Sequence, residues 1–125
     1  MSDAENAATL EAILDGFNSH DVDKIMSHFT ADCVFEAPRG PEPWGRRFVG
    51  KEAVRGGLAA RFAGIPDVRY DDATHFACGN RGLSEWTIVG TAVDGEVIEV
   101  RGCDLWTFSD DGRVMRKDSY WKIRE

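Results

Sequence analysis

The chain has 125 residues, of which 42% are hydrophobic and 30% are charged, and its formal net charge is −7. That length fits one domain over residues 1–125, and no apolar run nears the roughly 20 residues needed to span a bilayer. The acidic balance disfavours nucleic acid and anionic membranes as partners. Because the first residues offer neither a basic leader nor an apolar stretch, we expect no secretory signal and a cytoplasmic location.

The N-terminus reads as a helical hairpin. Residues 2–5 (Ser-Asp-Ala-Glu) have the form of a capping box and precede apolar residues at helical spacing, which predicts an amphipathic helix. Asp21 can cap a short second helix whose apolar stripe reaches Phe29.

Strand and helix alternate in the next segment. Residues 33–36 have strand character, which should stop at Ala37-Pro38. Residues 39–45 are rich in Gly and Pro, so we expect a loop there. A short strand over residues 46–50 and a third helix over residues 51–62 follow.

From Asp67 onward the apolar period becomes that of strands. Turn signals at residues 79–82, Asp94-Gly95 and Asp111-Gly112 separate four long strands. Strands this long must twist and curl. We therefore expect an α+β fold, in which a curled antiparallel β-sheet forms a cone that the three N-terminal helices cover.

One carboxylate stands out in the last strands. Strand alternation places Asp104 on the same face as Trp106 and Phe108, and an acid on an apolar face must be neutralised, paired or used. Asp104 is therefore the first candidate for a pocket residue. Its alternative role is structural, as a buried acid tied to a backbone amide or to a nearby Arg or His.

The element order, residues 29–32 (Phe-Thr-Ala-Asp), residues 37–43 (Ala-Pro-Arg-Gly-Pro-Glu-Pro) and the segment 104–121 together resemble the SnoaL-like members of the NTF2-like superfamily, with their cystatin-like roll. The likeness covers nearly the whole chain. Its ketosteroid isomerase branch implies a base just before the proline, where this chain has Ala37, and a tyrosine donor where it has Ile13. The third group of that branch, a protonated aspartic acid that donates a hydrogen bond, matches Asp104. Steroid isomerisation is therefore not the leading hypothesis.

Two other branches resemble the chain in part. The arginine and first aspartate of the limonene epoxide hydrolases fall on Trp86 and Ile88, and the acid of the polyketide cyclases falls within residues 117–120. If strand alternation holds, Ser119 shares the cavity face with Trp121 while Asp118 points to the other side. Both branches stay open.

The remaining candidates are a base and a set of walls. His75 lies on an expected strand and could supply the base that Ala37 does not, or be structural. The loop residue Trp44 is expected at the cavity mouth. The residues expected to contact substrate are Ile13, Phe17, Trp44, Trp86, Ile88, Ser119 and Trp121. No spacing suggests a metal or nucleotide, so any chemistry should be cofactor-free. Cys33, Cys78 and Cys103 are expected to be reduced core residues.

Two functional hypotheses follow. The first is a cofactor-independent enzyme of isomerase, cyclase or hydrolase type acting on a small hydrophobic, oxygen-bearing molecule. Asp104 would be its acid or hydrogen-bond donor, and His75 or an ordered water its base. It requires an enclosed cavity beside a desolvated Asp104, and it fails if Asp104 is paired to a cation with no cavity beside it. The second is a non-catalytic binding or assembly module that forms a homodimer through the sheet.

Overall fold

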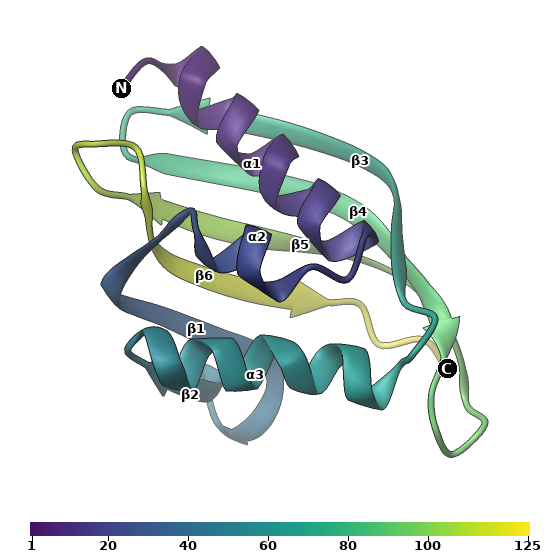
Figure 1. The fold of residues 1–125 in the computed structure, drawn as a ribbon. Helices are drawn as coiled ribbons and strands as arrows, with labels where there is room; N and C mark the ends of the chain where they lie inside the picture. The colour runs from purple at the N-terminus through teal and green to yellow at the C-terminus, as the bar shows by residue number, and fades with distance from the viewer.

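A computed structural model describes residues 1–125 as three helices packed on one face of a six-stranded sheet (Figure 1). The helices are α1 (Asp3–Asn18), α2 (Val22–Met26) and α3 (Lys51–Gly64). The strands are β1 (Phe29–Glu42), β2 (Gly45–Val49), β3 (Arg69–Cys78), β4 (Arg81–Thr91), β5 (Val97–Phe108) and β6 (Val114–Trp121). None of the helices is long and apolar enough to cross a membrane.

The sheet has the order β2-β1-β6-β5-β4-β3. Strands β3 to β6 form the predicted antiparallel meander, β1 pairs with β6 in parallel, and β2 pairs with β1 antiparallel. In Figure 1, α1 crosses the β3 end of the sheet and α3 lies over β1 and β2. The predicted α+β architecture is confirmed.

Local sequence signals explain where the helices begin and where the strands turn. Ser2 and Glu5 form the reciprocal capping box of α1, and the Asp21 carboxylate accepts from the backbone N–H of Lys24 at 3.0 Å. The β4–β5 and β5–β6 turns place Gly95 and Gly112 at positive φ, where glycine carries no steric cost. These segments fold as their sequence predicts.

The predicted loop over residues 39–45 is wrong. β1 continues through Pro38 to Glu42 because β2 pairs along it, with partners Ala37–Arg46 and Glu42–Gly45. The hairpin turn leaves no room for a side chain at Gly45: its φ is +81°, and a Cβ there would lie 1.9 Å from the Ala37 carbonyl oxygen.

The expectation for the cysteines is corrected in part. Cys33 is buried in the core, Cys103 is half-buried and Cys78 is exposed. Cys78 has the same strand parity as Phe76, so its side chain lies on the outer face of β3, which no helix covers.

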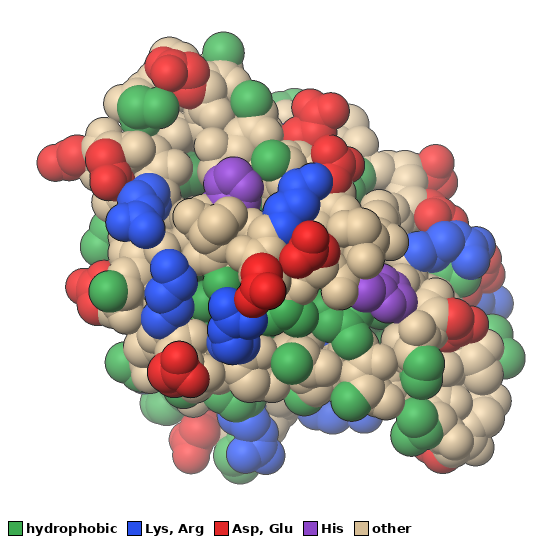
Figure 2. Space-filling view, viewed as in Figure 1, with side chains coloured by type: hydrophobic (Ala, Val, Ile, Leu, Met, Phe, Trp, Pro, Cys, Tyr) green, Lys and Arg blue, Asp and Glu red, His purple; other side chains and the backbone are tan.

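The sheet has two unlike faces, which we call inner and outer. The inner face packs on the helices and holds the apolar core, including Phe35, Trp86, Ile88, Trp106 and Phe108. The outer face carries no helix. Figure 2 looks onto the helices, where acidic and basic side chains are interspersed without a large patch of either sign.

Candidate functional site

A row of polar side chains crosses the inner face. His75, Ser84, Asp104 and Ser119 are register partners in turn along β3, β4, β5 and β6. Since side chains of paired residues share a face, the row is continuous across four strands. It lies in the middle of the apolar core, so its members must satisfy one another.

Asp104 is the centre of this row. Its Oδ1 accepts from the Lys117 ammonium at 2.9 Å and from the Ser119 hydroxyl. Its Oδ2 accepts from the Trp86 indole N–H at 2.9 Å. Gly102, the register partner of Trp86, makes this geometry possible, because a Cβ there would lie 2.5 Å from the indole ring. Every partner is a donor, so Asp104 is an acceptor here.

Lys117 is the cation of the site. Its side chain and that of Asp104 are each only 6% exposed, and its Nζ also donates to Ser119 at 2.7 Å. The ammonium lies 4.8 Å from the ring centre of Phe35 and 5.3 Å from that of Phe17, so aromatic faces complete its surroundings. Burial lowers the pKa of Lys117, and the attraction of Asp104 opposes that shift.

His75 joins the row through Ser84. The Ser84 hydroxyl oxygen accepts from the Trp106 indole N–H at 3.0 Å and lies 2.7 Å from His75 Nδ1. The Ser84 proton can then point at Nδ1, which fits a neutral ring with its proton on Nε2. Burial lowers the pKa of His75, which favours the same neutral form.

A cavity of about 10 Å³ lies beside Asp104, room for one water molecule. One wall is polar and belongs to the sheet, and the other is apolar and belongs to α1. Its lining residues are Leu10, Ile13, Leu14, Phe17, Tyr70, Ser84, Asp104, Trp106 and Lys117. Burial raises the pKa of Tyr70, so its phenol keeps its proton and can donate.

Six of the seven predicted contact residues lie toward the inner face, in three groups. Ile13 and Phe17 line the cavity, and Trp86 and Ser119 bond to Asp104. Ile88 and Trp121 lie further along the inner face, where the Trp121 ring stacks on the Arg61 guanidinium at 4.5 Å.

Trp44 departs from its expected place. It lies in the β1–β2 turn, outside the inner cavity, because β1 and β2 extend the hairpin beyond the edge of the core. Asp118 points to the outer face, while Ser119 reaches Asp104.

The arrangement of Asp104 also differs from the expected lone proton donor. Asp104 is paired to a cation, and the cavity beside it is the size of a water molecule. The enzyme hypothesis fails if Asp104 is paired to a cation and has no cavity beside it. The first part of that condition is met, and the second is not. What the site offers chemically is a donor, Lys117, next to an acceptor, Asp104. No group of three or more His, Cys, Asp or Glu side chains is placed to hold a metal ion.

Lys117 is the residue of this polar site that sequence analysis missed. A signal for it existed: it has the same strand parity as Ser119 and Trp121, which were placed on the cavity face. A lysine in a strand flanked by charges reads as solvated, so only its acidic partner on the neighbouring strand reveals it.

Comparison with known proteins identifies the family. Residues 10–117 match the model of the SnoaL-like domain. The chain belongs to this family. A search of curated proteins finds no match.

Three solved structures illustrate the shared SnoaL-like fold. An NTF2-like protein of unknown function from Mesorhizobium loti is 28% identical, with a TM-score of 0.79 over 97% of this chain and 93% of its own. A protein from Xanthomonas campestris pv. campestris, provisionally named a polyketide cyclase, is 18% identical, with a TM-score of 0.82 over 96% and 92%. TerC, crystallised with polyporic acid, is 20% identical, with a TM-score of 0.77 over 94% and 92%.

Proposed function

We infer that this SnoaL-like protein binds a small hydrophobic, oxygen-bearing molecule on the inner face, with the Lys117–Asp104 pair as its polar anchor. The observation that carries this is the buried pair itself. Two charges inside an apolar core cost desolvation energy that packed hydrophobic residues would not, so the fold alone gives no reason for them. Buried charge partners beside a cavity are typical of functional sites.

The two sides of the cavity suit such a ligand. Lys117 and Tyr70 can donate to a ligand oxygen, and Asp104 can accept a ligand hydroxyl. Leu10, Leu14 and Phe17 on α1 offer the apolar contact. Leu14 is only half-buried, so a ligand larger than water enters by displacing this helix wall rather than the paired strands. The polyporic acid of the TerC crystal is consistent with this class of ligand.

The indole N–H signals of Trp86 and Trp106 provide a direct test, because those groups bond to Asp104 and Ser84. We would titrate 2-naphthol and naphthalene, which differ by one hydroxyl, into ¹⁵N-labelled protein. 2-Naphthol should move both signals and bind about tenfold more tightly, the worth of one hydrogen bond to a buried charge. Lys117→Met should remove the preference, and exposed Lys122→Met should keep it. Equal binding of the two probes by wild type would contradict the proposal.

Catalysis on the bound molecule is a second step of the same proposal. With Lys117 donating to a ketone oxygen, Asp104 could accept a proton from the adjacent carbon, as in cofactor-free isomerisation. His75 would take that proton through the Ser84 hydroxyl, because its Nδ1 faces Ser84 and not the cavity. The test is exchange of the α-protons of 2-tetralone in D₂O. Asp104→Asn and His75→Gln should each slow the exchange if that residue is the base. Exchange no faster than in buffer would leave binding alone.

The second candidate function is a homodimeric module. One row on the outer face joins Phe76, Leu83 and Leu105, all apolar, and Phe76 is 56% exposed. Exposed apolar clusters on a bare sheet face favour self-association. Sedimentation velocity should then show a dimer that Phe76→Asp converts to a monomer. A wild-type monomer at all concentrations would end this candidate.

A further inference from the structure

A second cavity, of about 260 Å³, opens on the outer side of the sheet between β6 and the β1–β2 hairpin. It is far larger than the inner cavity, and neither proposed function uses it. Its lining residues are Ala37, Pro38, Pro43, Trp44, Gly45, Arg116, Asp118, Ser119 and Tyr120.

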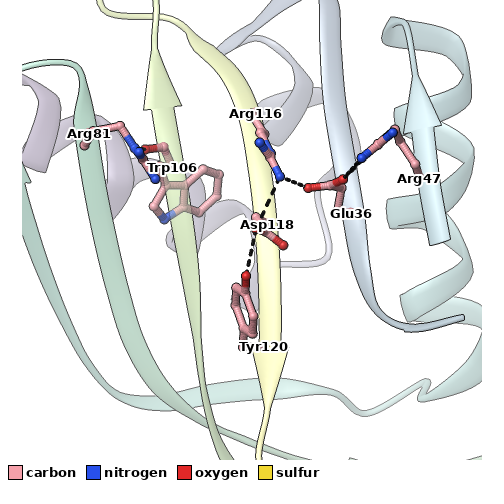
Figure 3. A network of polar contacts seen from close by, with 7 residues as sticks. All are labelled: Glu36, Arg47, Arg81, Trp106, Arg116, Asp118 and Tyr120. Atoms are coloured by element: carbon pink, nitrogen blue, oxygen red, sulfur yellow. Dashed lines mark hydrogen bonds and ion pairs between the residues drawn. The ribbon is translucent and has the colours of Figure 1, made fainter. Parts of the chain in front are cut away.

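The cavity exists because two paired strands separate. The parallel ladder of β1 and β6 ends at the pair Glu36–Asp118. Pro38 has no N–H with which to continue it, and β1 follows β2 away from β6. Beyond Asp118, β6 is paired on its β5 side only. Figure 3 shows the two strands diverging beside Asp118 and Tyr120.

The charges at the closed end of this cavity balance one another. Glu36 is fully buried between two half-exposed arginines, and it accepts from Arg47 at 2.6 Å and from Arg116. Arg116 also reaches Asp118 at 3.5 Å, and the Tyr120 hydroxyl donates to the same Asp118 oxygen at 3.1 Å. Two carboxylates are thus balanced by two guanidinium groups (Figure 3).

Some hydrogen-bonding capacity stays unused in that network. The second oxygen of Asp118 accepts from no protein group, and Nε of Arg116 donates to none. An acceptor and a donor therefore stand side by side on β6 at the cavity wall.

Flat side chains form the other walls. Trp44 has the Arg47 guanidinium 4.5 Å from its ring centre on one face, which orients the indole. Tyr120 is held by its bond to Asp118. Pro38 and Pro43 add rigid apolar surface. A planar ring is the shape that such walls accept best.

We propose that this outer pocket binds a small neutral aromatic molecule bearing an amide or lactam group. Its ring would lie against Trp44 and Tyr120, its N–H would donate to Asp118, and its carbonyl would accept from Arg116. A charged ligand gains little, because an anion meets Asp118 and a cation meets Arg116, whereas a neutral amide complements both. The apolar outer row Phe76-Leu83-Leu105 ends beside the pocket, because Leu105 is the register partner of Asp118.

The Trp44 indole N–H signal tests the proposal, with benzamide as the probe and benzoate, benzylamine and toluene as matched ligands. Benzamide should move the Trp44 signal and leave Trp86 and Trp106 in place, which separates this pocket from the inner site. It should bind about tenfold more tightly than toluene, from hydrogen bonds to two charged groups, and more tightly than either charged analogue. No shift of Trp44, or equal binding of toluene, would overturn the proposal.

Two variants locate the contacts. Asp118→Ala should weaken benzamide about tenfold and reduce its advantage over toluene, while Trp44→Ala should weaken both ligands alike. Asp23→Ala, which removes an exposed carboxylate on the helix side, is the matched control and should change neither. Thermal melts confirm that each variant folds. Unchanged benzamide affinity in folded Asp118→Ala would overturn the assignment.

Discussion

The two faces of the sheet each hold a charged network, yet the two networks differ in what surrounds them. On the inner face, Lys117 and Asp104 are each 6% exposed. On the outer face, Glu36 is equally buried, but Arg47 and Arg116 remain 43% and 47% exposed. The inner pair thus has both charges out of water, whereas the outer network keeps its cations solvated.

That difference shows which of the two networks carries the larger desolvation cost. A half-exposed arginine loses little hydration when it covers a carboxylate, so the outer network is compatible with stability alone. A fully buried pair is not easily explained in that way. The contrast is the reason why we propose the inner face as the place where this SnoaL-like protein anchors a ligand.

The largest effect should come from breaking the inner pair. Lys117→Met leaves Asp104 buried without its cation, which should cost about 3–5 kcal/mol of unfolding free energy, measured by urea denaturation. Adding Asp104→Asn should recover part of the loss, because the amide still accepts from Trp86 without a charge. A double variant less stable than Lys117→Met would show that the charge on Asp104 is not the source of the cost.

Enlarging the inner cavity should separate stability from binding. Phe17→Ala removes an aromatic ring from the α1 wall and should cost about 3–5 kcal/mol by large-to-small truncation. The same variant should bind 2-naphthol more tightly than wild type, because the ligand no longer displaces that ring. Isothermal titration calorimetry measures this, and weaker binding would argue against the helix wall as the place of entry.

The outer network should give a smaller, pH-dependent effect. Hydrogen bonds from Arg47 and Arg116 lower the pKa of Glu36 below its ordinary 4.5, although burial opposes them. Glu36→Gln should cost about 1–2 kcal/mol, discounted for the exposure of the arginines. A carboxyl group whose pKa is lower in the folded protein than in the unfolded chain stabilises the fold at pH values above its unfolded pKa. The difference in unfolding free energy between wild type and Glu36→Gln should therefore be full at neutral pH and shrink as the pH falls below 4.5. Urea titrations at a series of pH values test this.

His75 should give the smallest effect. Burial lowers its pKa below the ordinary 6.5, while Glu11 and Asp15 on α1 and Asp104 on β5 oppose the shift. The folded state therefore binds fewer protons than the unfolded state, and stability should fall as the pH drops through 6.5 toward the folded value. His75→Gln should remove that slope. An identical slope in the variant would place the titration elsewhere.

The fold follows closely from local patterns. The capping residues Ser2 and Asp21 and the Gly95 and Gly112 turns act within a few residues, so the sequence predicts them. The course of β1 past Pro38 depends on pairing with β2, a contact that local turn chemistry cannot reveal. Cys78 was misplaced because the helices cover only one face of β3, and Cys78 lies on the other face.

The site was predicted in part. The features set within one strand were predicted, and the features that depend on contacts between elements were not. Alternation brings Asp104, Trp106 and Ser119 to one face, because side-chain direction is a property of each strand. The ion pair between Asp104 and Lys117 joins two neighbouring strands, β5 and β6. The size of the cavity depends on how α1 packs on the sheet. Neither is written in a single segment, so the sequence could indicate an acid in the core but not its partner.

The ¹⁵N signal of the Lys117 ammonium tests the central claim most directly, recorded in free protein and in protein saturated with 2-naphthol. If Lys117 anchors the ligand, the Nζ signal should shift on binding, and exposed Lys122 should not. If the Trp86 and Trp106 indole signals show that the ligand is bound and the Lys117 signal is still unchanged at saturation, the account is contradicted. The buried pair would then be a structural feature.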